Sequence, residues 1–197
     1  APHTLFWVEA LDGGDPVVKV PHRDRLMQLR ASFSGDPEEV YRAEHRIWGM
    51  TWGAEGGMLM LAQWERMRRW EYFWLLDVDE GTARLWYDLA RDDRYGNPGY
   101  PVLLQLPNGR RVMRQNGDVV YFSGGGATEQ GDRPFLDLRR LDTGETERLF
   151  RCDPGRYESF VAFAGGEDRF VLRSESVVDV PNYYLATFGK EIEAIKG

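Results

Sequence analysis

A hairpin-like stretch recurs along this chain, and its repetition limits the folds open to the sequence. Residues 73–87 read FWLLDVDEGTARLWY, in which Trp74, Leu76 and Val78 alternate with other side chains, as in a half-buried strand. Asp79-Glu80-Gly81 is typical of a tight turn, because Asp bonds its own backbone and Gly accepts a positive φ. A second short strand follows, so the stretch predicts a β-hairpin.

The same pattern appears twice more. Residues 135–150 repeat it with the turn Asp142-Thr143-Gly144, and residues 26–41 repeat it more loosely with Ser34-Gly35-Asp36-Pro37. The second strands of the copies carry an apolar residue at matching places, at Val40, Leu85 and Leu149, which are 45 and 64 residues apart. Four strands in about 45 residues is the period of a β-propeller blade.

Further strands are expected around these hairpins, at 4–10, 47–53, 58–62, 101–106, 110–114, 119–123, 157–164, 169–174 and 182–187. The strand at 47–53 carries bulky residues on both faces and is expected to be covered on both. Asn108-Gly109 and Asn116-Gly117 predict type I′ turns, which need a positive φ at both residues. The glycine-rich segment 124–134 is expected to be a loop.

The predicted fold is all-β, a partial β-propeller of about three to four four-stranded antiparallel blades. The propeller is expected over residues 4–187, with blades at roughly 4–43, 47–87, 101–150 and 157–187, and a tail or linker at 188–197. Closed propellers typically have four to eight blades, so the chain is expected to form an arc. End blades of an arc expose apolar faces, which predicts self-association, for example of two chains that close a ring.

Two segments have features that are typical of an α-helix. In 62–73, AQWERMRRWEYF, Trp64, Met67 and Trp70 lie three residues apart as on a helix face. The interpretation we favour is a long hairpin with arginines stacked on the tryptophans. A short helix is expected at 190–196.

Composition narrows the class of protein. A net charge of −7 argues against a nucleic-acid binder, although the cations and aromatics of 66–74 are a combination seen in single-strand binders. The lone Cys152 excludes an internal disulfide and is expected to pack as a small apolar residue. No apolar run approaches the ~20 residues that span a bilayer, and no membrane partner is expected. The N-terminus shows no signal peptide and enters a strand almost at once, so we expect a part of a larger protein, either cytoplasmic or secreted.

Candidate cofactor and metal motifs are incomplete. Gly124-Gly125-Gly126 lacks the Lys-Ser/Thr of a phosphate-binding loop, and His22-Arg23-Asp24 resembles a kinase catalytic loop but has Leu29 where the metal-binding Asn belongs. Asp77, Asp79 and Glu80 cluster at a turn without the further ligands of a calcium loop. We therefore expect no cofactor-binding and no metal-binding residues.

No catalytic constellation is apparent either. The three histidines, His3, His22 and His45, lack the spacing of a zinc site. Gly53-Ala54-Glu55-Gly56-Gly57 has Glu where a nucleophilic serine would stand between glycines. No catalytic residue is predicted in this chain.

Several short motifs, in this order, resemble the propeller domain of the prolyl oligopeptidase family of serine peptidases, and most closely its glutamyl endopeptidase-like members. The resemblance covers residues 4–185 and rests on LFWVE (5–9), KVPHRD (19–24), WG (52–53), RRW (68–70), WLLD (74–77), DRYGNPG (93–99), LPNGRR (106–111), GDRPFL (131–136) and PNYY (181–184).

The resemblance implies a function without catalysis. Members of this family carry an α/β-hydrolase domain with a Ser-Asp-His triad after the propeller, and none of those residues has a counterpart here. The expected role is to gate or select peptide substrates, with the hydrolase domain and the peptide as partners. The alternative is a freestanding propeller-like binding or scaffold module.

Overall fold

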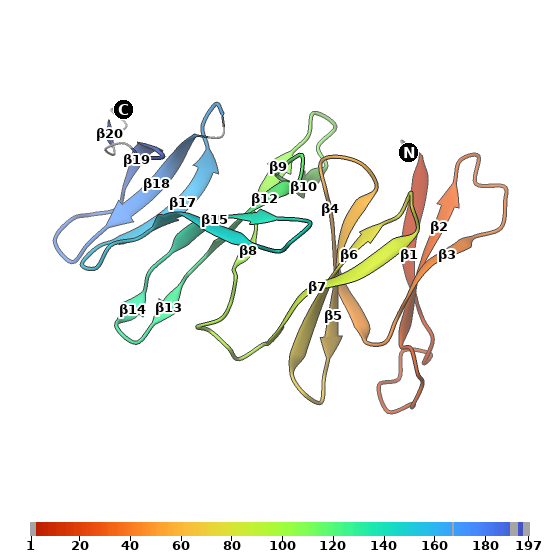
Figure 1. The fold of residues 1–197 in the computed structure, drawn as a ribbon. Coiled ribbons are helices and arrows are strands. Elements are labelled where there is room, and N and C mark those ends of the chain that lie inside the picture. The colour runs from red at the N-terminus through yellow and green to blue at the C-terminus, as the bar shows by residue number, and fades with distance from the viewer. Residues whose placement is uncertain (1–2, 167, 190–192, 195–197) are drawn as a thin grey trace. The chain divides into compact units, whose positions relative to one another are not determined.

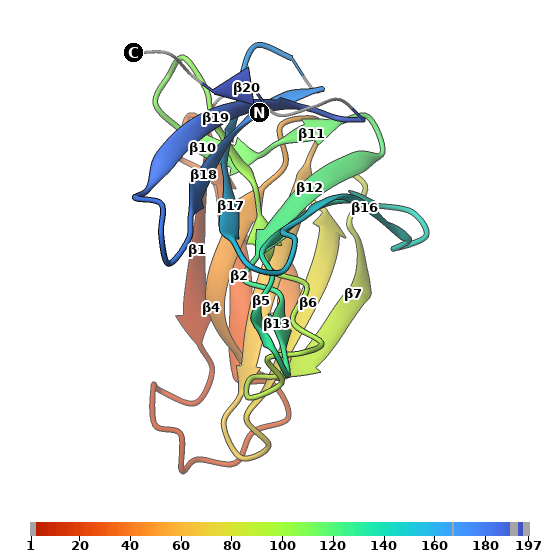
Figure 2. The same cartoon turned by 90° about the vertical axis from the view of Figure 1, so that its left-hand side faces the viewer.

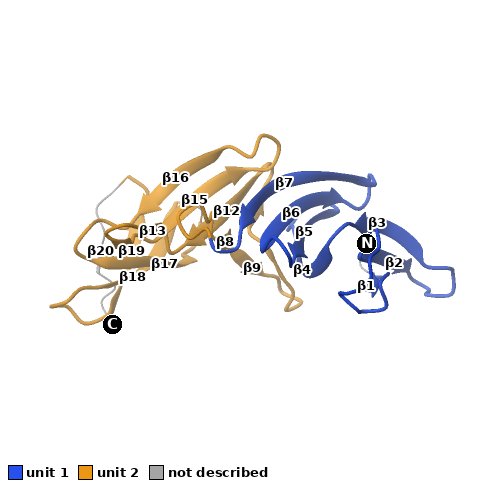
Figure 3. Ribbon diagram, turned by 90° about the horizontal axis from the view of Figure 1, so that it is seen from below, with its two compact units in different colours: residues 1–92 blue, residues 93–197 orange. Residues whose placement is uncertain are grey.

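The computed structural model describes residues 3–166, 168–189 and 193–194, and these residues form strands, turns and loops without a helix (Figure 1). Every pair of neighbouring strands is antiparallel. The chain divides into two compact units, Ala1–Asp92 and Asp93–Gly197 (Figure 3). In the described part, no helix is long and apolar enough to cross a membrane. The all-β fold class is therefore confirmed.

Unit 1 contains two meandering sheets. The first has three strands in the order β1 (Thr4–Ala10), β2 (Asp24–Arg30) and β3 (Glu38–Ala43). The second has four, in the order β4 (Arg46–Trp52), β5 (Met58–Glu65), β6 (Trp70–Asp77) and β7 (Thr82–Ala90), and Figure 2 shows β5, β6 and β7 side by side. Four buried leucines form the core of this unit, namely Leu26, Leu59, Leu61 and Leu76.

Unit 2 also contains two main sheets and two small ribbons. The strands of the five-stranded sheet are β8 (Tyr100–Pro101), β11 (Gln115–Asn116), β12 (Val119–Gly124), β15 (Phe135–Arg140) and β16 (Thr146–Arg151). The four-stranded sheet has the order β17 (Tyr157–Phe163), β18 (Arg169–Glu175), β19 (Asn182–Thr187) and β20 (Glu193–Ala194). The ribbons are β9 (Leu103–Gln105) with β10 (Arg111–Met113), and β13 (Ala127–Thr128) with β14 (Gly131–Asp132). Only two of the four main sheets have the four strands expected of every blade.

All three hairpins that the sequence predicts are present, as β2–β3, β6–β7 and β15–β16. Each also contains a β-bulge that the pattern does not reveal, at Leu26/Met27, Phe73/Trp74 and Leu136/Asp137. The extra residue of the bulge lies on the second strand of each hairpin, at Val40, Trp86 and Leu149. The matching residue of the middle copy is therefore Trp86 and not Leu85, because a bulge shifts the alternation of side chains by one.

The strand at 47–53 was expected to be covered on both faces, and this prediction is wrong. β4 is the edge strand of its sheet, and a bulge at Ile47/Gly49 inserts Trp48, whose exposed fraction is 51%. The segment 124–134 is not a plain loop either, since it contains the ribbon β13–β14.

The hairpin expected over 62–73 is confirmed, because this segment forms the β5–β6 hairpin. The stacking expected of Arg66, Arg68 and Arg69 on the tryptophans is confirmed for Arg68, whose guanidinium lies 4.9 Å from the centre of the Trp70 ring. Arg69 instead forms an ion pair with Asp92. The helix expected at 190–196 lies outside the described residues except for Glu193–Ala194, which form β20.

The Asn-Gly turns differ from the predicted type I′. Gly109 and Gly117 have positive φ, whereas Asn108 and Asn116 do not. At Gly109 the amide donates to the carbonyl of Leu106, and the Asn108 side chain accepts the Arg110 N–H at 3.0 Å. The side-chain bond favours a three-residue loop with a single left-handed glycine.

Candidate functional site

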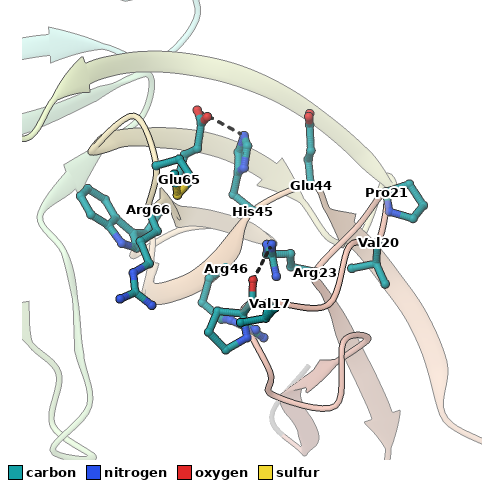
Figure 4. Close-up of a pocket in the computed structure, with 12 residues that line it drawn as sticks. Val17, Val20, Pro21, Arg23, Glu44, His45, Arg46, Glu65 and Arg66 are labelled. Atoms are coloured by element: carbon teal, nitrogen blue, oxygen red, sulfur yellow. Dashed lines mark hydrogen bonds and ion pairs between the residues drawn. The ribbon is translucent and has the colours of Figure 1, made fainter.

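A pocket of about 800 Å³ lies in unit 1 (Figure 4). It lies where the β1–β2 loop, the β3–β4 connection and the β5–β6 turn come together. The residues that line it are Pro16, Val17, Val20, Pro21, Arg23, Glu44, His45, Arg46, Trp64, Glu65, Arg66 and Met67.

A buried carboxylate organises the β1–β2 loop. The Asp12 side chain is shielded from solvent and accepts hydrogen bonds from Arg46 Nη2 (2.5 Å), Arg23 Nη1 (2.8 Å) and the Gly14 amide (2.9 Å). The Arg46 guanidinium, helped by the other donors, holds the pKa of Asp12 well below its usual range despite burial. Asp12 therefore stays ionised and ties the loop to β4.

A second buried carboxylate completes this network. Asp24, at the start of β2, accepts bonds from Arg46 Nη1 and from the Ile47 amide. Arg46 thus bridges Asp12 and Asp24 from a third element. The His22-Arg23-Asp24 motif, which resembled a catalytic loop, supplies two members of this structural ion network.

The opposite wall contains a cluster around Glu65. The Tyr72 hydroxyl donates to Glu65 Oε2 at 2.8 Å, and Arg68 Nη1 lies 2.9 Å from the Tyr72 oxygen. The His45 ring stacks on Tyr72 at 4.8 Å, with its Nε2 atom 3.9 Å from Glu65 Oε2. Burial and the acceptor Glu65 raise the pKa of Tyr72 to about 12, so the phenol remains a donor at neutral pH. His45 and Glu65 also line a second pocket of about 450 Å³.

The mouth of the larger pocket is apolar on two sides. Val17 on the β1–β2 loop is 82% exposed, and Met67 on the β5–β6 turn is 91% exposed. Arg66, next to Met67, forms no ion pair within the part of the chain that the structure describes. The lining includes no serine, threonine or cysteine. An apolar lining with a few polar groups is typical of ligand-binding pockets.

The other candidate motifs of the sequence lie apart from this pocket. Gly126 has a φ of 60°, and a Cβ there would lie 2.1 Å from the Arg133 carbonyl oxygen, so the glycine run serves close backbone packing. Asp77 accepts the amides of Asp79 and Glu80 at 3.0 Å each, as in a turn. Among the described residues, no group of three or more His, Cys, Asp or Glu side chains is placed to hold a metal ion.

Cys152 is buried in unit 2. The Glu158 amide donates to its sulfur at 3.1 Å, and burial raises the pKa of the thiol. A buried thiol with a raised pKa is a poor nucleophile.

The sequence patterns do not reveal the ion network of Asp12, Asp24 and Arg46, because these residues are far apart in the chain. Asp12 and Arg46 are separated by 34 positions. The available signal was Asp12 two residues after a strand and directly before Gly13-Gly14, a context in which an Asp side chain commonly bonds to the following backbone.

Comparison with known proteins gives the relationship of this chain. No protein-family profile matches it. It is 30% identical over 203 residues to the probable chloroplastic glutamyl endopeptidase of rice (Oryza sativa subsp. japonica), covering 93% of this chain and 22% of the relative. It is 31% identical over 187 residues to the probable chloroplastic glutamyl endopeptidase of Arabidopsis thaliana, covering 89% of this chain and 19% of the relative. The chain therefore spans about one-fifth of the length of these curated relatives.

Solved structures align with the chain at low sequence identity. An uncharacterized protein of Listeria monocytogenes EGD-e aligns with a TM-score of 0.52 and 8% identity, over 87% of this chain and 46% of that one. The β-propeller domain of the Trilobed protease from Pyrococcus furiosus aligns with a TM-score of 0.49 and 14% identity, over 98% of this chain and 54% of that one. The sequence relationship agrees with the motifs: over about nine-tenths of its length, the chain is similar to proteins named probable glutamyl endopeptidases.

Proposed function

We propose that this chain is a non-catalytic β-propeller segment of a serine peptidase, and that it gates or selects peptide substrates for an α/β-hydrolase domain of the longer protein. The observation that carries the proposal is the similarity, over about nine-tenths of the chain, to proteins named glutamyl endopeptidases. The pocket of unit 1 supports the binding role, because its lining combines exposed apolar side chains with Arg66, which has no ion-pair partner among the described residues.

The division into blades at 4–43, 47–87, 101–150 and 157–187 is part of the proposal. Recurring bulges support it. Each of the three hairpins β2–β3, β6–β7 and β15–β16 contains a bulge on its second strand. A recurring irregularity of this kind is what repeated structural units produce.

Peptide hydrolysis tests the catalytic part of the proposal. Residues 1–197 alone are expected to cleave glutamyl peptides no faster than buffer does, whereas the longer protein cleaves them. Hydrolysis by the isolated chain would overturn the non-catalytic assignment. A longer protein without a Gly-x-Ser-x-Gly motif would favour the freestanding binding module instead.

Steady-state kinetics of the longer protein tests substrate selection. Arg66→Glu is expected to change the ratio of kcat/KM between acidic and neutral peptides, because it reverses the charge at the pocket mouth. Arg84→Glu on β7 is the matched control, since this exposed arginine does not line the pocket. Equal ratios in both variants and the wild type would contradict a selecting role for this pocket.

Self-association of the isolated chain is the last part of the proposal. An arc of blades leaves apolar end faces uncovered, and such faces associate in water. Light scattering is expected to show a mass above 22.7 kDa at micromolar concentration. A clean monomer would contradict it.

A further inference from the structure

We infer that the pocket of unit 1 binds an apolar side chain of a peptide, held between Val17 and Met67. The inference rests on the proposed peptide-binding function and names the chemical class that this pocket takes. Both side chains line the same pocket although they come from loops far apart in sequence, Val17 from the β1–β2 loop and Met67 from the β5–β6 turn. Single exposed apolar residues are common on protein surfaces, but two that face one cavity form a site where apolar surface can be removed from water.

Val17 is held in place by polar contacts that leave its side chain free. Its amide donates to Asp15 Oδ1 at 2.9 Å, and the Val18 amide donates to the Asp15 carbonyl at 3.2 Å. Arg23 donates to the carbonyls of Pro16 (3.2 Å) and Val18 (3.4 Å). The Asp12 network anchors Arg23 in turn, so this lip is ordered before any ligand arrives and binding costs little loop entropy.

The opposite lip is adaptable. Met67 is unbranched and nearly fully exposed, and a thioether side chain packs against surfaces of varied shape. Trp64 and Val20 add to the apolar lining of the same pocket. One rigid lip and one adaptable lip suit a range of aliphatic and aromatic side chains rather than a single residue type.

The size and polarity of the pocket favour a peptide as the occupant. A volume of about 800 Å³ exceeds what one side chain fills, which leaves room for the neighbouring backbone. Arg66 provides N–H donors for peptide carbonyl oxygens, because no acid engages it in the described part of the chain. The named relatives are peptidases, so a peptide is the ligand that their function supplies.

Titration of residues 1–197 with a peptide series tests the inference. The probes are Ac-Ala-Ala-X-Ala-Ala-NH₂ with X as Ala, Val, Leu or Phe, and binding is followed by NMR of ¹³C-methyl-labelled methionines. The Met67 resonance, assigned by its loss in Met67→Gln, is expected to shift on binding. Affinity should rise about fourfold for each methylene group added to X, because this is the change in binding constant that corresponds to the free energy of burying one methylene group.

Variants of the two lips provide the second measurement. Val17→Ser and Met67→Gln should each weaken binding of the Leu peptide roughly tenfold. Val177→Ser is the matched control, because Val177 is a fully exposed valine of unit 2 outside the pocket, and it should leave the affinity unchanged. Both target side chains are exposed, so neither substitution removes core packing.

The possible results separate this inference from the proposed function. Equal affinity for all four peptides, or affinity insensitive to Val17→Ser and Met67→Gln, overturns the apolar-side-chain inference and leaves the peptide-selecting role intact. Failure of the Leu and Phe peptides to bind at millimolar concentration also overturns the inference. The proposed function is judged separately, by hydrolysis and by the kinetics of the Arg66→Glu variant in the longer protein.

Discussion

The hairpins β6–β7 and β15–β16 each contain a bulge on the second strand, but the residue pair next to the bulge is apolar in one hairpin and charged in the other. In unit 1 the cross-strand pair next to the bulge is Trp74 with Leu85. In unit 2 the same position holds Asp137 with Arg148, joined by a bidentate ion pair. The backbone arrangement is therefore compatible with an apolar pair or with a charged pair in which the acid is buried and the arginine is partly exposed.

The difference appears in the ionisation of Asp137. Burial raises the pKa of this carboxyl, and the Arg148 hydrogen bonds offset the effect only in part. Asp12 has its pKa lowered, because the hydrogen bonds from Arg46, the Gly14 amide and Arg23 outweigh the effect of burial. The balance between burial and hydrogen bonds to the carboxylate gives each shift its sign.

The largest expected effect distinguishes the residues inserted at the two bulges. Trp86 is buried, with 8% of its surface exposed, whereas Leu149 is only half-buried. Trp86→Ala should lower the free energy of unfolding by about 3–5 kcal/mol, and Leu149→Ala by about 1–2 kcal/mol. Urea denaturation measures both losses. Equal losses would show that the two inserted side chains contribute equally to packing.

Arg148→Met should produce the next largest effect. It leaves Asp137 buried without its partner, and the expected loss is about 1–3 kcal/mol at pH 7, below that of a fully buried pair because Arg148 is partly exposed. The double variant Asp137→Leu/Arg148→Leu copies the apolar character of the unit 1 pair. It should unfold within about 1 kcal/mol of the wild type. A double variant as unstable as the single one would show that unit 2 requires the charges.

Local patterns predicted the hairpins, because alternation and turn residues act over a few positions. Asp79-Glu80-Gly81 and Asp142-Thr143-Gly144 both mark real turns, with Gly81 and Gly144 at positive φ. The bulges were not predictable in this way, because the extra residue, such as Trp86, is of a type that is ordinary in a strand and no turn residue marks its position. That single residue accounts for the misplaced match at Leu85.

The candidate site was less accessible to sequence reasoning than the hairpins. Its pocket depends on contacts among three segments, and the Asp12–Arg46–Asp24 network forms only when β1, β2 and β4 are assembled. Arg23 and Asp24 stand out in the sequence through a resemblance to a kinase motif, although their role is to hold the β1–β2 loop. Long-range ion pairs of this kind have no local periodicity to reveal them.

The turn glycines of the two hairpins, Gly81 and Gly144, have similar backbone conformations and are expected to respond alike to substitution. Gly81 has a φ of 68° and Gly144 a φ of 74°, a region that alanine enters at a cost. Gly81→Ala and Gly144→Ala should each lower the free energy of unfolding by about 1 kcal/mol, because restriction of the unfolded chain offsets part of the strain. Thermal and urea unfolding of both variants test this. A loss confined to one turn would show that only one hairpin needs the left-handed glycine.

The smallest effects concern pH, and their signs are opposite in the two units. The raised pKa of Asp137 means that the folded state binds its proton more tightly, so this stabilisation is complete below the unfolded-state pKa and is lost as pH rises through the folded-state pKa. The lowered pKa of Asp12 contributes stability above the unfolded-state pKa that is lost as pH falls.

Arg148→Met removes the influence that lowers the Asp137 pKa, so the destabilisation caused by this substitution should shrink as the pH is reduced from 7 toward 4. Asp12→Asn should instead flatten the loss of stability that the wild type shows on acidification. Urea unfolding at a series of pH values measures both trends, and a penalty for Arg148→Met that is independent of pH would mean that Asp137 does not take up a proton in the folded state.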